Sequence, residues 1–138
     1  MDLAEHNYQM GGIQKMVYNQ KEILVIDYSN RKETEMIKRI TALGEYIKKE
    51  NKHVLVLAIF NDRSLATPAF MLQTRRVTSE VGHLIDKKAL IGLNLAKKMI
   101  LKGQNILFHT NTRGFDSMEE AVQYLLEDKI VEPSKVIL

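Results

Sequence analysis

The stretch HVLVLAIF, residues 53–60, is almost continuously apolar and in part β-branched. A strand with one face in water alternates apolar and polar residues, whereas a strand that is covered on both faces reads as an unbroken apolar run. Residues 53–60 are therefore predicted to form the central strand of a sheet.

The residues before this strand predict a β-hairpin and a helix. IQKMVY (13–18) and EILVIDYS (22–29) are two β-prone runs around the short connection Asn19-Gln20-Lys21, which indicates an antiparallel pair. Residues 32–50 place apolar side chains at helical spacing, with most lysines and arginines elsewhere on the helical wheel. This segment is predicted to be an amphipathic helix.

The residues after the central strand predict further helices and strands. Thr67-Pro68 suits a helix start, because threonine caps free amides and proline lacks the N–H group that would need a cap, and this helix should reach about Leu84. KALIGL (88–93) predicts a second buried strand. Residues 95–109 favour a helix, although NILFH (105–109) alone also fits a strand.

The carboxyl-terminal part predicts a short edge strand at TRGF (112–115) and a helix over 117–128. Ser117 and Glu120 have the spacing of a capping box at the start of that helix. The terminal KVIL (135–138) can add another edge strand or dock in a homodimer. Strands that alternate with helices indicate an α/β fold with a layered architecture.

Length and composition set the domain organisation. The chain has 138 residues, enough for one sizeable core and too few for two, so residues 13–138 are predicted to form a single domain. Residues 1–12 are polar and end in Gly11-Gly12, and we expect them to be a mobile lead-in.

Charge and cysteine content limit the function classes. Lys plus Arg exceed Asp plus Glu by 20 to 17, a net charge of +3, which is too small to demand a nucleic-acid partner. The chain has no cysteine, which excludes thiol catalysis and thiolate metal sites. No apolar run approaches the roughly 20 residues that span a bilayer, and the amino terminus is unlike a signal peptide. We therefore expect a cytoplasmic protein without a membrane span.

The order of elements and two segments resemble the STAS-like family related to the sporulation anti-anti-sigma factor. One segment is ALIGL (89–93) followed by a lysine-bearing helix, and the other is FDSMEEAVQYL (115–125). The resemblance covers residues 13–128. It implies a mixed sheet of about five strands with helices mainly on one face, and a helix for residues 95–109. The shape is shared with sulphate-transporter cytoplasmic domains and, more loosely, with lipid-binding CRAL-TRIO domains.

The resemblance also directs attention to the loop after the central strand. In the anti-anti-sigma proteins a phosphorylatable serine begins the next helix; the matching loop here is NDRSLATP (61–68), without the family's Asp-Ser-Ser-Gly pattern. Asp62, Arg63, Ser64 and Thr67 are thus candidate ligand or partner contacts, and Ser64 and Thr67 are candidate phosphorylation positions. The alternative is that Thr67 only caps the helix and Ser64 lies in a solvated loop.

Lysines around KALIGL suggest a second candidate surface. Lys97, Lys98 and Lys102, with the earlier Lys87 and Lys88, can form a basic surface near the carboxyl end of that strand for an anionic ligand or acidic partner. The alternative is structural: the lysines border a buried strand and cover the outer face of a helix. Because the two lysine pairs flank opposite ends of the predicted strand, the structural interpretation is preferred.

Catalysis finds little support in the sequence. The four histidines are dispersed without metal-ligand spacing, and no phosphate loop or nucleophile motif is present. Folding could still assemble a site, for example from His83 with Asp86 or Asp62. We expect no enzyme activity, no metal and no cofactor.

The hypothesis is a STAS-like binding or regulatory module for a protein partner or a small anionic or apolar ligand. The alternative is a lipid or hydrophobic-ligand carrier, followed by an enzyme with a dispersed site.

Overall fold

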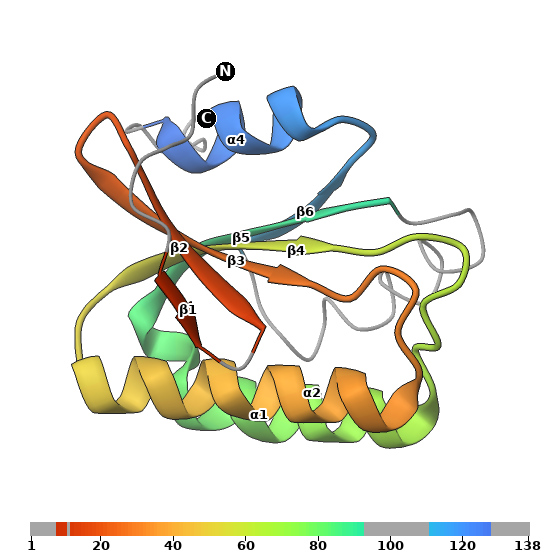
Figure 1. Cartoon of the computed structure of the whole chain (residues 1–138). Helices are drawn as coiled ribbons and strands as arrows, with labels where there is room; N and C mark the ends of the chain where they lie inside the picture. Colours follow the sequence, from red (N-terminus) through yellow and green to blue (C-terminus); the bar gives the residue numbers. More distant parts are fainter. Residues whose placement is uncertain (1–7, 11, 93–110, 128–138) are drawn as a thin grey trace, which may run out of the picture.

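The computed structural model describes residues 8–10, 12–92 and 111–127, which form one sheet with helices on both faces (Figure 1). The strands are β1 (Tyr8–Met10), β2 (Ile13–Tyr18), β3 (Lys21–Asp27), β4 (Val54–Ile59), β5 (Ile85–Ile91) and β6 (Thr112–Phe115). The helices are α1 (Glu33–Glu50), α2 (Pro68–Val81), the short 3-10 helix η1 (Gly82–Leu84) and α4 (Met118–Leu126).

The strands lie in the sheet in chain order, from β1 to β6. The pairs β1–β2 and β2–β3 are antiparallel, and the pairs from β3 to β6 are parallel. The predicted α/β fold with a mixed sheet is therefore confirmed, and the five expected strands correspond to β2–β6. β4 lies between β3 and β5, as the continuous apolar run of residues 53–60 predicts.

The sheet has one strand that we did not expect. Tyr8–Met10 pair with β2, from Tyr8 opposite Lys15 to Met10 opposite Ile13. These three residues belong to the predicted lead-in, and their backbone pairs with the edge of β2. The mobility of residues 1–12 stays a prediction.

Residues with positive φ follow the strands β2 and β5 and explain why these strands end where they do. The β2–β3 turn consists of Asn19 and Gln20, which both have positive φ (53° and 67°), as a two-residue hairpin turn requires. β5 starts at Ile85, earlier than predicted, and ends at Ile91, earlier than the predicted residue 93. Gly92 follows with φ +82°, and a Cβ atom there would lie 1.7 Å from the carbonyl oxygen of Phe60, so only glycine fits this exit.

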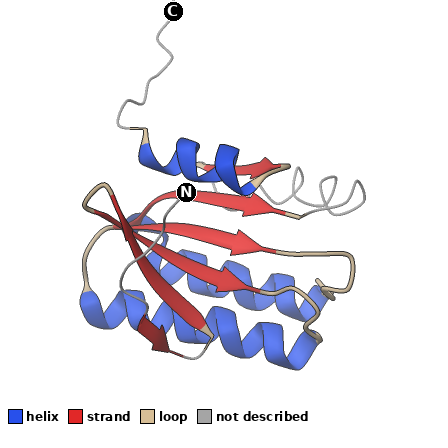
Figure 2. Cartoon of the chain, turned by 45° about the horizontal axis from the view of Figure 1, so that its top comes forward, coloured by secondary structure: helices blue, strands red, loops and turns tan. Residues whose placement is uncertain are grey.

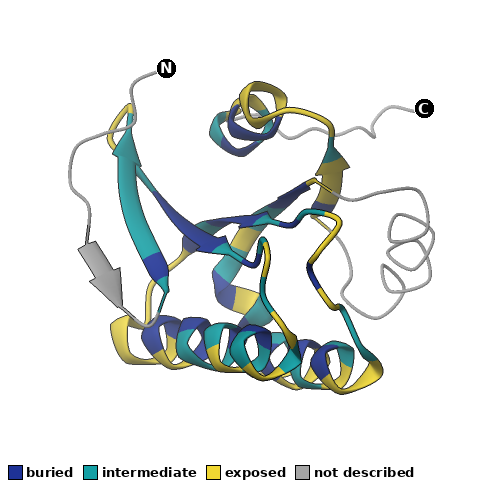
Figure 3. Cartoon of the chain, turned by 45° about the vertical axis from the view of Figure 1, so that its right-hand side comes forward, coloured by how far each residue is buried: buried dark blue, intermediate teal, exposed yellow. Residues whose placement is uncertain are grey.

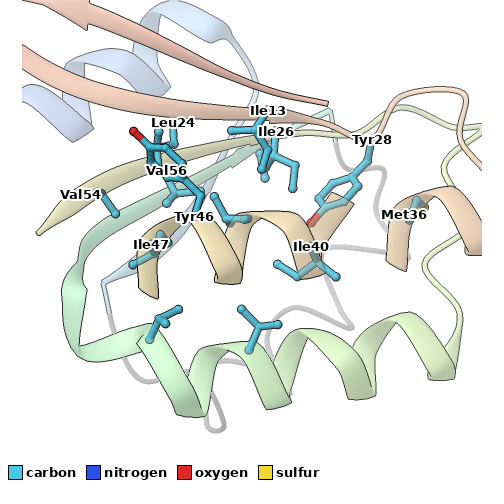
Figure 4. Packing of buried hydrophobic residues seen from close by; sticks show 14 of the residues in the cluster. Ile13, Leu24, Ile26, Tyr28, Met36, Ile40, Tyr46, Ile47, Val54 and Val56 are labelled. Carbon is cyan, nitrogen blue, oxygen red and sulfur yellow. The ribbon is translucent and has the colours of Figure 1, made fainter. Parts of the chain in front are cut away.

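One core layer lies between the sheet and the helices α1 and α2. Figure 4 shows Ile26 and Val56 of the sheet and Ile40 of α1 in one buried cluster, and all three are at most 1% exposed. α1 and α2 approach closely at Gly44, where a Cβ atom would lie 2.8 Å from Cγ1 of Val77. These apolar contacts hold both helices on the same face of the sheet.

The second core layer lies under α4, on the opposite face (Figure 2). Ala121 and Leu125 are buried against the strands, in the same cluster as Leu57 and Ala89. The Ser117 hydroxyl accepts a hydrogen bond from the backbone N–H of Glu120 at 3.2 Å, which confirms the predicted cap. The described part of the chain thus has two long helices on one face and α4 on the other. The predicted helix at 95–109 and KVIL (135–138) lie outside the described residues.

Candidate functional site

Two loops meet at the carboxyl ends of the parallel strands β3 and β4. Residues 28–32 connect β3 to α1, and residues 60–67 connect β4 to α2. Figure 1 shows both loops at the same edge of the sheet, next to the amino ends of the two helices. Open α/β sheets bind ligands outside the carboxyl ends of their strands, so this edge is the candidate site.

Asn30 and Asn61 tie the two loops together. The Asn30 backbone N–H donates to the Asn61 side-chain oxygen at 3.0 Å, and the Asn61 side-chain amide donates to the Asn30 side-chain oxygen at 2.9 Å. A backbone bond of 3.2 Å from Leu65 N–H to the carbonyl oxygen of Arg31 adds a further link. The two loops therefore form one hydrogen-bonded frame.

The buried Ser64 side chain also links the two loops by hydrogen bonds. Its hydroxyl donates to the carbonyl oxygen of Tyr28 at 2.9 Å and accepts from the backbone N–H of Asn61 at 3.0 Å, and the residue is 2% exposed. The interpretation that Ser64 lies in a solvated loop is wrong, because its hydroxyl replaces water as the partner of these backbone groups. Phosphorylation at Ser64 stays a prediction, and it requires the loop to open.

Thr67 starts α2. Its side-chain oxygen accepts from the backbone N–H of Phe70 at 3.2 Å, with Pro68 at the first helical position, so the predicted capping role is confirmed. The Thr67 hydroxyl is also hydrogen-bonded to the carboxylate of Glu33, which begins α1. A phosphate on Thr67 stays a prediction; it would meet the repulsion of Glu33.

An aromatic cluster lies at the base of the two loops. Tyr28 packs against Phe60 and Phe70, with ring centroids 4.9 Å and 5.0 Å apart, and all three side chains are buried. Burial also raises the pKa of the Tyr28 hydroxyl, which stays neutral. The loop frame therefore rests on a rigid apolar base.

The outward side of the second loop carries the other candidate residues. Asp62 and Arg63 are exposed, so both can contact a partner directly. Leu65 is 48% exposed, although leucine side chains are more often buried. The sequence interpretation included Asp62 and Arg63 and missed Leu65, whose exposure depends on how the loop is held.

The outward face of α2, which follows the loop, carries further exposed residues. Leu72 is 53% exposed, and Arg75 and Arg76, one turn further along, are also exposed. The opposite face of the helix is buried at Phe70 and Val77. Figure 3 shows exposed and buried residues alternating along the helices, as expected for helices with one face toward the core. Leu72 is therefore not needed for packing of α2 onto the sheet.

A histidine–carboxylate contact lies at the start of β4 and β5, away from the loops. Nδ1 of His53 is 2.7 Å from Oδ1 of Asp86, and both side chains are more than half exposed. The partner of Asp86 is thus His53, and the suggested pairing of Asp86 with His83 is wrong. His53 immediately precedes β4 and Asp86 lies in β5, so the pairing of these two strands holds the two side chains close together.

A surface depression of about 340 Å³ lies at the same end of the strands. It is lined by Lys21, Leu55, Asp86, Lys87, Asn111, Leu125 and Glu127. The Lys87 ammonium donates to the carbonyl oxygens of Tyr124 at 2.8 Å and Glu127 at 2.6 Å. Because a cation at a helix carboxyl end satisfies free carbonyl groups, Lys87 anchors α4, which supports the structural interpretation of this lysine.

The remaining lysine candidates divide into two groups. Lys88 lies within β5, next to Val56 and Thr112 in the neighbouring strands, and burial lowers its pKa to about 8. The sequence placed Lys88 at a strand border, whereas the residue is half-buried within β5. The predicted basic surface of Lys97, Lys98 and Lys102 lies outside the described residues.

No group of three or more metal-binding side chains occurs in residues 8–10, 12–92 and 111–127, and none of the helices found there is long and apolar enough to cross a membrane. No family model, no curated protein and no solved structure matches this chain.

Proposed function

We propose that this chain is a cytoplasmic, non-enzymatic STAS-like module that binds a protein partner through the loop at 61–67 and the adjoining helix α2. The described fold supports the proposal through its antiparallel β2–β3 hairpin, which is followed by parallel strands and helices in the order the resemblance implies. Because one fold hosts many functions, the site must carry the functional part of the proposal.

The proposal that this surface binds a protein rests mainly on the exposure of Leu65 and Leu72. They are two of the three large hydrophobic side chains that are exposed among the described residues, and both belong to the 61–76 segment. We call the surface of Arg63, Leu65, Leu72, Arg75 and Arg76 the α2 surface. Leucine and arginine side chains together provide apolar contact area and directional hydrogen bonds to a protein partner.

The hydrogen-bonded loop frame supports binding in a second way. The bonds between Asn30 and Asn61 and between Ser64 and Tyr28 hold the 60–67 loop in one conformation. A surface that is ordered before binding loses less conformational entropy when the partner arrives. Leu65 is thus presented from a rigid support.

The alternatives receive less support from the described residues. A lipid carrier would use apolar side chains of α2, but Phe70, Val77 and Val81 are packed into the core with α1 and the sheet. An enzyme with a dispersed site would use His53 and Asp86, but this exposed pair lies at the amino ends of the strands, away from the loop frame. A small anionic ligand at the same loop remains an outcome of the test below.

Native mass spectrometry of the protein purified from its own cells tests the proposal. We expect a complex with a second protein, which is lost in Leu72→Asp and retained in Gln123→Asp. Gln123 is exposed on α4, on the other side of the sheet, so it controls for the added charge. A complex that survives Leu72→Asp, or a bound lipid or small anion in place of a protein, would contradict the proposal.

A further inference from the structure

We propose that the partner of the α2 surface is an acidic protein segment, in which carboxylate side chains flank an apolar one. This inference rests on the proposed function and adds the chemistry of the partner. It follows from the charges around Leu65 and Leu72.

Each exposed leucine has arginine neighbours. Arg75 and Arg76 follow Leu72 by three and four residues, and side chains at these spacings are neighbours on a helix surface. Arg63 precedes Leu65 by two residues in the loop, and it is also exposed. A partner that covers Leu72 therefore meets guanidinium groups, and a partner that also contacts the loop can reach the exposed Arg63.

The two helix arginines are not neutralised within the described part of the chain. Glu80 has the spacing to pair with Arg76, but its carboxylate lies 3.4 Å from the ammonium of Lys48 on α1. Arg76 instead donates to the neutral side-chain oxygen of Gln73 at 3.3 Å. Neither Arg75 nor Arg76 forms an ion pair with a described residue, so their charge is available to a partner.

Carboxylates are the groups that fit this arrangement. The planar guanidinium group donates two parallel hydrogen bonds to a carboxylate, while the aliphatic stem of arginine lies along apolar surface. A nucleic acid fits less well, because the net charge of the chain is only +3. In addition, the exposed apolar side chains beside the arginines are leucines, which do not stack on bases as aromatic side chains do. Exposed arginines next to an exposed leucine therefore favour a protein segment that is both acidic and apolar.

The test is a selection from a phage library of random dodecapeptides on the immobilised protein, with counter-selection on Leu72→Asp. Affinities of the enriched synthetic peptides are then measured for the wild type, for the double variant Arg75→Glu, Arg76→Glu and for Gln123→Asp. We expect peptides rich in Asp, Glu and apolar residues. They should bind the double variant at least about tenfold more weakly, bind Gln123→Asp unchanged, and weaken as salt is raised.

The outcomes separate this inference from the proposed function. Peptides that require Leu72 but are neutral or basic would overturn the acidic partner and leave the binding module intact. A selection that yields no peptide able to distinguish wild type from a folded Leu72→Asp would overturn both. Self-association of the wild type that Leu72→Asp abolishes would assign the surface to a second copy of the chain and also overturn the acidic partner.

Discussion

The Ser64 hydroxyl donates a hydrogen bond of 2.9 Å to the backbone carbonyl oxygen of Tyr28, across 36 residues of chain. The bond joins the two loops at the carboxyl ends of β3 and β4. It makes the candidate site a rigid support for Leu65, and it makes Ser64 a structural residue in the described conformation.

Replacement of Ser64 should loosen this support. In Ser64→Ala the backbone N–H of Asn61 loses its acceptor inside the protein, and we expect the free energy of unfolding to fall by about 1–3 kcal/mol. Ser79→Ala is the matched control, because the Ser79 hydroxyl also bonds a backbone carbonyl but is exposed; it should change stability by less than about 0.5 kcal/mol. Urea unfolding measures both. Equal effects would show that Ser64 does not close the loop.

Gly92 should tolerate no side chain. In Gly92→Ala the added Cβ atom meets the backbone of Phe60 at a positive φ, and we expect a loss of roughly 3 kcal/mol or more in the free energy of unfolding. Gly82→Ala, with φ −59° and its nearest neighbour a methyl group of Thr78 at 3.1 Å, should be within about 1 kcal/mol of the wild type. Thermal unfolding distinguishes them, and a stable Gly92→Ala would refute the close contact of β5 with Phe60.

Lys87 should hold the end of α4. Lys87→Met keeps the length of the side chain but removes the hydrogen bonds to Tyr124 and Glu127, so α4 should lose about 1 kcal/mol of local stability. Hydrogen exchange of the α4 amides provides the measurement. Lys48→Met, which breaks an exposed ion pair with Glu80, should leave those amides unchanged. Unchanged protection in Lys87→Met would contradict the anchoring role.

Lys88 should make stability depend on pH. Burial lowers its pKa to about 8, below the ordinary value of about 10.4. Between these pH values the unfolded chain binds a proton that the folded protein does not, so the free energy of unfolding rises with pH. Relative to Lys88→Met, the wild type should gain on the order of 1 kcal/mol between pH 7.5 and 10. A pH-independent difference between the two proteins would contradict the lowered pKa of Lys88.

Local patterns predicted most of the fold. The apolar run of β4, the helical spacing in α1 and the caps at Thr67 and Ser117 depend on neighbouring residues, and all four features are present. β1 was missed because three residues carry too short a pattern, and their structure comes from pairing with β2. The start of β5 was missed because Asp86 and Lys87 are polar residues within a strand.

The candidate site was only partly predictable, because its contacts join distant residues. Asn30 and Asn61 are 31 positions apart, and the only local signal is the tolerance of asparagine for the positive φ of 61° at Asn30. The burial of Ser64 could not be read from NDRSLATP, since a polar loop normally indicates solvent. The exposure of Leu65 and Leu72 likewise depends on how the 60–67 loop and α2 are oriented against the sheet, which the local sequence does not specify.

Photo-crosslinking in the source cells tests the central claim, that the α2 surface binds a protein partner, most directly. The photoreactive residue p-benzoylphenylalanine replaces Leu72 in one protein and Gln123, on the opposite side of the sheet, in another. We predict a discrete adduct with a second protein at position 72 that is absent at position 123, with the crosslink mapped to a segment rich in Asp and Glu. The same adducts at both positions, or crosslinks from position 72 only to residues of this chain, would contradict the account.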